Sequence, residues 1–184
     1  MECKHRCSRT QLVLVLLILG WAKGKNVVEI TDFWQDCENG KPMISVDLTD
    51  LEMGEDDEGN PTLMGKFVFE ADFNDPTKMI VSSERLRQGT WTPDAITRDV
   101  ANMCPLILEE NEVWYAVSSQ MNQTTCPFKK GHVESFSNVL VNSYGVDIPH
   151  SFIGDWRIYI EVTTEREDGE HTECFRMVFT IKEI

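Results

Sequence analysis

The residues of this chain best suited to chemistry are its six cysteines. Two of them, Cys3 and Cys7, lie close to the N-terminus. Zinc-binding cysteines come in close pairs such as C-x2-C, and the wide spacing of the remaining cysteines excludes that pattern. An even number of widely spaced cysteines in a secreted chain favours disulfides, and four cysteines allow three alternative pairings. We therefore predict two disulfides among Cys37, Cys104, Cys126 and Cys174.

The other polar residues do not form a recognisable catalytic or metal-binding pattern. His132, His150 and His171 are scattered, without the spacing of a metal-binding pair or of a nucleophile motif. A reactive thiol is also disfavoured, because an oxidising compartment would convert it to a disulfide. We expect no enzymatic activity, no cofactor and no metal site.

The N-terminus has the pattern of a secretory signal peptide. Three basic residues precede an unbroken apolar run over residues 12–19, and small residues follow it. The run is much shorter than the roughly 20 residues that span a bilayer. We predict a signal peptide over residues 1–22, one domain over residues 23–184, and a secreted, extracellular protein with no membrane span.

The net charge restricts the classes of partner. Without residues 1–22 the chain has 14 basic and 30 acidic residues, taken from totals of 17 and 31. This acidity disfavours nucleic acids and electrostatic binding to anionic membranes.

Most of the chain alternates between apolar and polar residues, which is typical of strands that have one buried face. The sequence Asp168-Gly169 between the last two strands predicts a hairpin in which both central residues take positive φ. The acidic stretch from Gly54 to Pro61 is expected to be a solvated turn. The predicted strands are Asn26–Ile30, Met43–Leu51, Thr62–Phe73, Lys78–Ser83, Glu112–Ser119, His132–Val141, Trp156–Arg166 and Glu170–Ile181.

One segment departs from this alternation and predicts a short helix. Thr92 is suited to the N-cap, Pro93 to the first helical position, and Asp94 to the positive end of the helix dipole. Apolar residues then recur at helical spacing up to Cys104. Short strands with one small helix predict an all-β fold, a two-sheet antiparallel sandwich or cup.

Bulky apolar side chains are frequent in the predicted strands. They are consistent with an ordinary packed core, or with sheets that splay apart around a cavity for an apolar ligand. Periodicity does not separate these alternatives, because both place the same residues inside. The candidates are Phe67, Phe69, Trp91, Trp114, Phe136, Trp156, Ile158, Ile160, Phe175 and Phe179.

An ordered set of residues over 126–184 carries a family resemblance. It consists of a Cys-Pro-aromatic-Lys motif, a glycine, an apolar loop with a proline, a Gly-x-aromatic-Arg motif and a last cysteine. These are Cys126, Pro127, Phe128, Lys129, Gly131, Pro149, Gly154, Trp156, Arg157 and Cys174. The set resembles the ganglioside activator-like and insect chemosensory B branches of the secreted lipid-recognition (ML-type) superfamily. The chain lacks the additional cysteine pairs of the activator branch, which favours the insect branch.

The resemblance implies a β-cup whose hydrophobic cavity takes lipid acyl chains, with the predicted short helix near its mouth. It also implies that Cys37 pairs with Cys174 and Cys104 with Cys126. On this basis the cavity is favoured over the filled core.

Four residues are candidates for the mouth of such a cavity. Lys129 and Lys130 stand out in so acidic a chain, and either a solvated strand end or contact with a polar ligand head group would explain them. Phe152 and Ile153 place apolar groups in a connecting loop, where they either mark a ligand mouth or fold back onto the core. Asn122 begins a valid sequon and is a predicted N-glycan site.

The sequence therefore predicts a secreted, non-enzymatic carrier of a hydrophobic ligand: a lipid, a fatty acyl chain or, from the resemblance, a pheromone-like hydrocarbon in chemosensation. One alternative is a cofactor that presents lipid to a hydrolase or a receptor, with the acidic loop or the Phe152 loop as contact surface. The other is a filled-core β-sandwich that acts through protein contacts.

Overall fold

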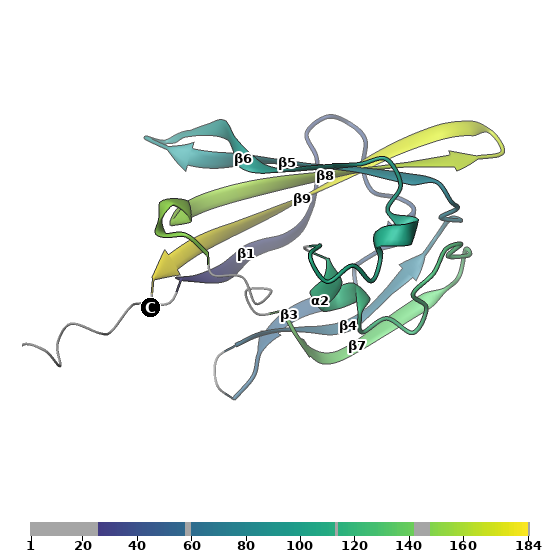
Figure 1. Ribbon diagram of the computed structural model, residues 1–184, viewed down its shortest axis with the longest axis horizontal. Helices are drawn as coiled ribbons and strands as arrows, with labels where there is room; N and C mark the ends of the chain where they lie inside the picture. Colours follow the sequence, from purple (N-terminus) through teal and green to yellow (C-terminus); the bar gives the residue numbers. More distant parts are fainter. Residues whose placement is uncertain (1–25, 58–59, 113, 142–147, 184) are drawn as a thin grey trace, which may run out of the picture.

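The computed structural model describes residues 26–57, 60–112, 114–141 and 148–183. The predicted signal peptide lies outside these residues. Two antiparallel sheets face each other (Figure 1), which confirms the all-β, two-sheet fold. Among the described residues there is one short α-helix, α2 (Tyr115–Ser118), and there are two 3-10 helices, η1 (Cys104–Leu106) and η2 (His150–Phe152).

The large sheet contains the longest strands of the protein. Its order is β1-β9-β8-β5-β6, so β8 and β9 lie at its centre and form a continuous hairpin. The alternation of apolar and polar residues that predicted β5, β8 and β9 places one apolar row of each toward the small sheet. The strands are β1 (Asn26–Asp36), β5 (Thr77–Arg87), β6 (Thr90–Val100), β8 (Gly154–Arg166) and β9 (Gly169–Glu183).

The small sheet is built around one strand, β4. β3 and β2 pair with successive parts of one side of β4, and β7 pairs with the other side. The second predicted strand, Met43–Leu51, is therefore divided into the short β2 and the start of β3. The strands are β2 (Val46–Asp47), β3 (Leu51–Glu55), β4 (Pro61–Phe69) and β7 (Val133–Leu140).

The helix predicted from Thr92 to Cys104 is wrong, because this segment forms β6. The strand pairs with β5 along one side and lies at the edge of the sheet. An edge strand tolerates Pro93, since the missing N–H removes no ladder hydrogen bond on the free side. Pairing with β5 therefore outweighs the local capping signals, and only a 3-10 turn follows at Cys104.

The strand predicted over Glu112–Ser119 is also wrong, because α2 forms within it. Trp114, Val117 and Met121 recur at helical spacing and pack against the interior. The hairpin between β8 and β9 likewise differs in detail. Its two loop residues are Glu167 and Asp168, and the positive φ of 122° belongs to Gly169, which pairs with Arg166. This shift by one residue excludes the predicted type I′ turn.

Both disulfides implied by the resemblance are confirmed. Cys37 and Cys174, which are 137 residues apart, join the segment after β1 to β9. Cys104 and Cys126 are 22 residues apart and close the segment that contains η1 and α2. We call residues 104–126 the cap segment. Figure 1 shows η1 and α2 between the two sheets.

Gly65 is the residue of β4 at which the ladder to β7 shifts register. Its φ is +98°, and a Cβ at this position would lie 1.9 Å from the carbonyl oxygen of Asp50. The close approach of these two backbones is therefore available only to glycine.

We predict that Gly65→Ala destabilises the protein strongly. A side chain would add a backbone clash to the strain of positive φ, so the free energy of unfolding should fall by about 3 kcal/mol or more. Gly40→Ala is the matched control, because Gly40 has φ +73° with no atom within 4 Å of the added Cβ. Equal losses for the two variants in urea unfolding would contradict the close-approach argument.

Candidate functional site

The centre of the large sheet presents an apolar patch to the space between the sheets. Ile158 pairs with Met177 and Ile160 pairs with Phe175, so all four side chains lie on one face. Both isoleucines pack against interior clusters, which shows that this face points inward. We call these four residues the apolar floor.

The side chains of the apolar floor are only partly buried, although the residues beyond it on both strands are buried. Trp156 and Phe179 flank it on one side, with 1% and 8% of their surface exposed. Val162 flanks it on the other side, with 7% exposed. A filled core would bury its centre best. The pattern is the opposite here, so the small sheet and the cap segment do not fully cover the middle of the large sheet.

Most of the predicted cavity residues surround this floor. Phe69 lies in a buried cluster with Phe73 and Phe128, and Phe136 lies in another with Leu51 and Leu63. Phe67 packs against both clusters, and Trp114 packs against the first. Trp156 and Phe179 form a third cluster with Ile181 at the end where β8 begins.

Trp91 is the exception among the predicted cavity residues. It pairs with Leu86, and the guanidinium of Arg157 lies 4.1 Å from the centre of its ring. Arg157 alternates with the inward-facing Trp156 and Ile158, so it points to the outer face of the sheet. Trp91 therefore does not line the space between the sheets.

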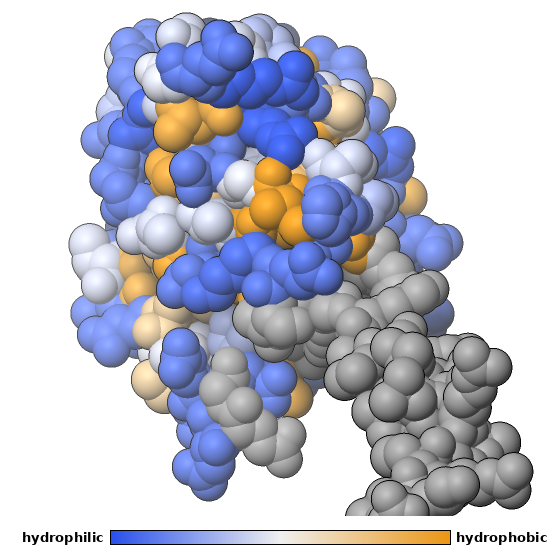
Figure 2. Space-filling view, turned by 90° about the vertical axis from the view of Figure 1, so that its left-hand side faces the viewer, coloured by the Kyte–Doolittle hydropathy of each residue, from blue (hydrophilic) through white to orange (hydrophobic). Residues whose placement is uncertain are grey.

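The predicted mouth residues Phe152 and Ile153 fold back onto the core. The ring of Phe152 stacks on Trp156 at 5.4 Å between centroids, and Trp156 Nε1 donates to the Phe152 carbonyl oxygen at 2.7 Å. The Arg85 guanidinium also donates to the carbonyl oxygens of Ser151 and Ile153. These contacts fix the loop. Figure 2 shows this end of the molecule, where apolar atoms still reach the surface between hydrophilic ones.

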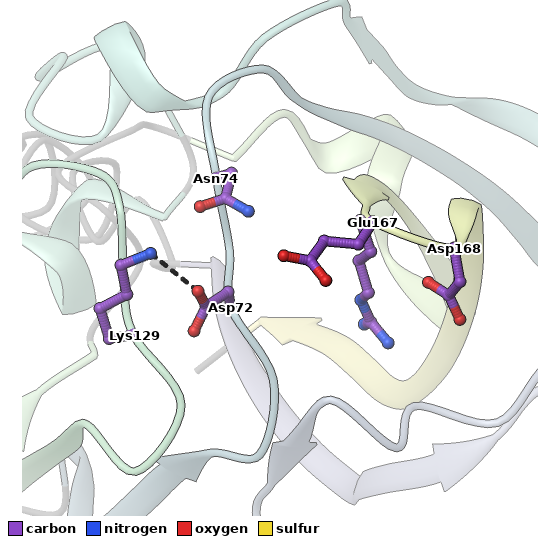
Figure 3. A pocket seen from close by; sticks show the side chains of 6 residues that line it. Asp72, Asn74, Lys129, Glu167 and Asp168 are labelled. Atoms are coloured by element: carbon purple, nitrogen blue, oxygen red, sulfur yellow. Dashed lines mark hydrogen bonds and ion pairs between the residues drawn. The ribbon is translucent and has the colours of Figure 1, made fainter.

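Lys129 lies in a polar pocket of about 510 Å³ (Figure 3). Its Nζ is 2.7 Å from Asp72 Oδ2, and the backbone N–H of Lys130 donates to Asp72 Oδ1 at 2.8 Å. The hydrogen bond from Lys129, together with that from Lys130, lowers the pKa of the Asp72 carboxyl. The lining residues are Asp72, Asn74, Lys129, Arg166, Glu167 and Asp168.

The polar pocket is separated from the apolar interior. Phe73 and Phe128 form a β-bridge and are both buried in an interior cluster. Asp72 and Lys129, their sequence neighbours, point the other way into the pocket, as alternation in extended chain requires. Lys129 therefore contacts a carboxylate outside the apolar space.

The two pairs of predicted mouth residues lie at opposite ends of the molecule. Phe152 stacks on Trp156 near the start of β8, whereas Lys129 shares its pocket with Arg166 at the end of β8. Ten residues of extended strand separate Trp156 from Arg166, which corresponds to roughly 33 Å. The prediction that all four residues line one cavity mouth is therefore wrong, because the structure places the two pairs at opposite ends of β8.

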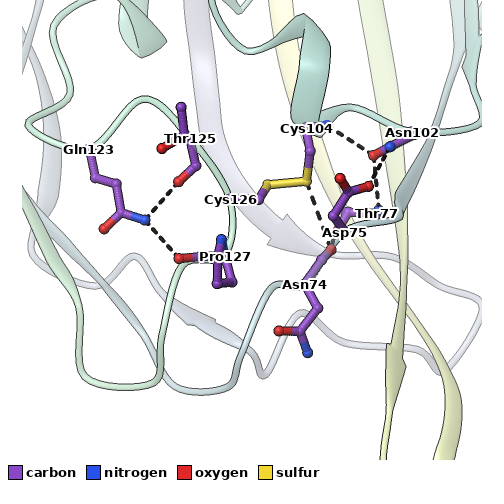
Figure 4. Close-up of a disulfide and its surroundings, with 9 residues drawn as sticks. All are labelled: Asn74, Asp75, Thr77, Asn102, Cys104, Gln123, Thr125, Cys126 and Pro127. Atoms are coloured by element: carbon purple, nitrogen blue, oxygen red, sulfur yellow. Dashed lines mark hydrogen bonds between the residues drawn. A yellow bond between two sulfur atoms is a disulfide. The ribbon is translucent and has the colours of Figure 1, made fainter.

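The cap segment covers part of the interior and is held at both ends. Figure 4 shows the Cys104–Cys126 disulfide with the hydrogen bonds around it. Asn102 Oδ1 accepts from the Cys104 N–H at 3.1 Å, and Gln123 Nε2 donates to the Pro127 carbonyl oxygen at 2.7 Å. The apolar side chains that face inward from this segment are Leu106, Ile107, Trp114, Val117 and Met121.

A buried carboxylate ties the end of the cap segment to β7. Glu134 has none of its surface exposed. It accepts from the backbone N–H groups of Asn122 and Gln123 at 2.7 and 2.9 Å, and its Oε1 is 2.6 Å from His132 Nε2. Burial raises the pKa of this carboxyl, but the Asn122 N–H, His132 and the Gln123 N–H together lower it further, so the net pKa is below the ordinary value.

The glycan prediction at Asn122 stays a prediction. The residue is exposed, as expected for an acceptor site, and its Nδ2 donates to Glu134 Oε2 at 3.1 Å.

Several residues of this site escaped sequence reasoning. Met177 is an interior residue that an alternating pattern could have found, since it lies two residues from Phe175 and from Phe179. The irregularity of β1 hides Trp34 from such a pattern. Glu134 could not have been found, because acidic residues are abundant and only the fold brings Asn122 and Gln123 to its carboxylate.

The comparisons leave the site to be interpreted from its own geometry. The chain matches no protein-family model, and no curated protein matches it significantly. Among the described residues, no helix has the length and apolarity needed to cross a membrane. In the same residues, no group of three or more His, Cys, Asp or Glu side chains is arranged to hold a metal ion.

We predict that stability falls on acidification because of Glu134. A carboxyl whose pKa is lowered by folding stabilises the native state above its unfolded pKa of about 4.3, and this contribution is lost as the pH falls through the lower, folded pKa. Glu134→Gln should cost about 1–3 kcal/mol at pH 7, because it replaces one acceptor oxygen by a donor. It should also flatten the acid limb of a plot of unfolding free energy against pH. An unchanged acid limb would contradict this assignment.

Proposed function

We propose that this protein is a secreted, non-enzymatic carrier that binds a hydrophobic small molecule or lipid between its two sheets. The observation that carries the proposal is the apolar floor. Four inward-facing apolar side chains stay partly exposed in the middle of strands whose flanking residues are buried. Apolar surface left accessible to water inside a sandwich gains free energy when an apolar ligand covers it.

The binding energy would come from desolvation. Each methylene transferred from water to such a surface contributes about 0.8 kcal/mol. A chain of about ten buried methylenes would gain on the order of 8 kcal/mol, less the costs of association and ordering. The aromatic rings of Phe67, Phe69 and Phe136 on the small sheet and of Phe175 on the large sheet would supply the shape to which the ligand fits.

Three further features support the proposal. Two disulfides and the predicted signal peptide favour an oxidising, extracellular setting. The acidic balance of the chain disfavours nucleic acids and anionic membranes as alternative partners. The resemblance to the secreted lipid-recognition superfamily favours a lipid or pheromone-like ligand and a chemosensory setting.

The test of this proposal is a pair of tryptophan substitutions on one strand. Met177 faces the space between the sheets, whereas its neighbour Val178 pairs with the outward-facing Arg157. A tryptophan at position 177 should occupy part of the ligand space. We expect it to weaken binding of the fluorescent apolar probe N-phenyl-1-naphthylamine about tenfold, which equals the loss of about two buried methylenes.

The same variant distinguishes an open interior from a filled one. Overpacking a filled core costs about 1–3 kcal/mol, whereas an open space admits the larger ring with little loss. We expect Met177→Trp to unfold within about 1 kcal/mol of wild type. Val178→Trp is the control and should leave probe binding unchanged. Strong destabilisation by Met177→Trp, with no probe binding to wild type, would overturn the proposal in favour of the filled-core sandwich.

A further inference from the structure

Trp34 is turned into the interior by an irregularity of β1. The register of β1 against β9 shifts between Ile30 and Asp32 and again between Asp32 and Gln35. In a regular strand, consecutive residues point to opposite faces. Here the consecutive Phe33 and Trp34 both pack against the cluster of Leu51, Leu63 and Phe136 from the small sheet. β-Bulges commonly re-aim a side chain in this way next to functional sites.

The ring of Trp34 lies beside the apolar floor. Its centroid is 4.0 Å from that of Phe175, in an edge-to-face arrangement, and 5.1 Å from that of Phe33. Phe175 is one of the four floor residues and belongs to the large sheet, whereas the cluster on the other side of Trp34 belongs to the small sheet. Trp34 therefore spans the space in which the proposed ligand would lie.

The indole N–H of Trp34 is buried and has no hydrogen-bond partner among the described residues. The other two interior tryptophans differ in this respect. Trp114 Nε1 donates to the Leu106 carbonyl oxygen at 3.0 Å, and Trp156 Nε1 donates to the Phe152 carbonyl oxygen at 2.7 Å. Buried tryptophan N–H groups usually find an acceptor, since an unpaired buried donor is unfavourable. Protein atoms enclose this nitrogen in the free protein, so a bound ligand supplies the missing acceptor once the neighbouring side chains move aside.

We propose that the ligand carries an uncharged oxygen acceptor, such as a ketone or an ester carbonyl, which receives the N–H of Trp34. This inference rests on the proposed function and adds the polar group by which the site selects its ligand. An ionised carboxylate is disfavoured, because a buried charge needs an opposite charge nearby. The neighbouring Arg176 is on the opposite face of β9 and is engaged by Glu38 and Gln35.

The test measures the dissociation constants of two ligands in the wild-type protein and in Trp34→Phe. The ligands are a long methyl ketone and the n-alkane of the same carbon number, and their dissociation constants are measured by displacement of N-phenyl-1-naphthylamine. Each ligand is compared between wild type and Trp34→Phe, because ketone and alkane differ in hydration. Trp34→Phe keeps an aromatic ring, removes the donor and makes the side chain smaller, and the alkane reports the loss of apolar contact that both ligands share. We expect it to weaken the ketone about tenfold, which corresponds to about 1.4 kcal/mol, and to leave alkane binding within about twofold.

Trp91→Phe is the matched control, since Trp91 lies on the outer face under Arg157, and it should change neither constant. A second readout uses the wild-type protein. The indole ¹H resonance of Trp34, assigned in wild type through its proximity to the rings of Phe33 and Phe175, should move downfield when the ketone binds and stay in place when the alkane binds. This readout keeps the inference falsifiable even if the variant folds poorly.

The outcomes separate this inference from the proposed function. Equal effects of Trp34→Phe on both ligands, or an indole resonance that the ketone does not move, would overturn the role of Trp34 while ligand binding itself stands. If wild type binds neither ligand and no probe, the proposed function fails and this inference fails with it.

Discussion

The antiparallel pairing of β8 with β9 determines where the candidate binding surface, the apolar floor, lies. Thirteen residue pairs in unbroken register place every second side chain of both strands on the inner face. The same register puts Trp156 and Phe179 at one end and Glu173, with Arg166 beside it, at the other. A slip of one residue would turn the apolar floor to solvent. The position of the floor midway along the hairpin follows from this pairing alone.

The second sheet and the cap segment then decide how well the floor is covered. β4 and β7 contribute Phe69 and Phe136 to two separate clusters, the first of which also contains buried residues of the large sheet, and the cap segment packs against both clusters. The Cys104–Cys126 disulfide and the hydrogen bonds to the buried carboxylate of Glu134 hold the cap segment in place. A fully buried carboxylate is tolerated only when its oxygens are satisfied, as they are by Asn122, Gln123 and His132. The cap segment is therefore held firmly at the edge of the interior, whereas the apolar floor at the centre of the large sheet is incompletely covered.

Much of this arrangement was predictable from the sequence, and the failures have physical reasons. Alternation identified β4, β5, β7, β8 and β9, because each has one buried face. The helix prediction after Thr92 fails, because the pairing of β6 with β5 across the turn at Gln88 and Gly89 outweighs the capping signals. The bulge that turns Trp34 inward breaks the period of two on which strand prediction depends. Lys129 and Phe152 looked like one mouth because sequence does not show that β8 separates them by its whole length.

The interior also shows how an apolar site can discriminate between ligands. Apolar contact provides affinity but distinguishes poorly between chains of similar shape. The unpaired indole N–H of Trp34, beside Phe175, would add a directional hydrogen bond while leaving the rest of the site apolar. The polar pocket around Lys129 does not contribute to the apolar site, because Phe73 and Phe128 lie between the pocket and the interior.

The most direct test for an apolar molecule between the sheets is native mass spectrometry of the disulfide-intact protein, followed by organic extraction of any bound molecule. An apolar molecule between the sheets predicts a discrete added mass that is lost on denaturation and recovered in the organic phase. A protein that has only its own mass, and that binds no fluorescent apolar probe after purification, would contradict the claim and show that the space between the sheets is filled by side chains.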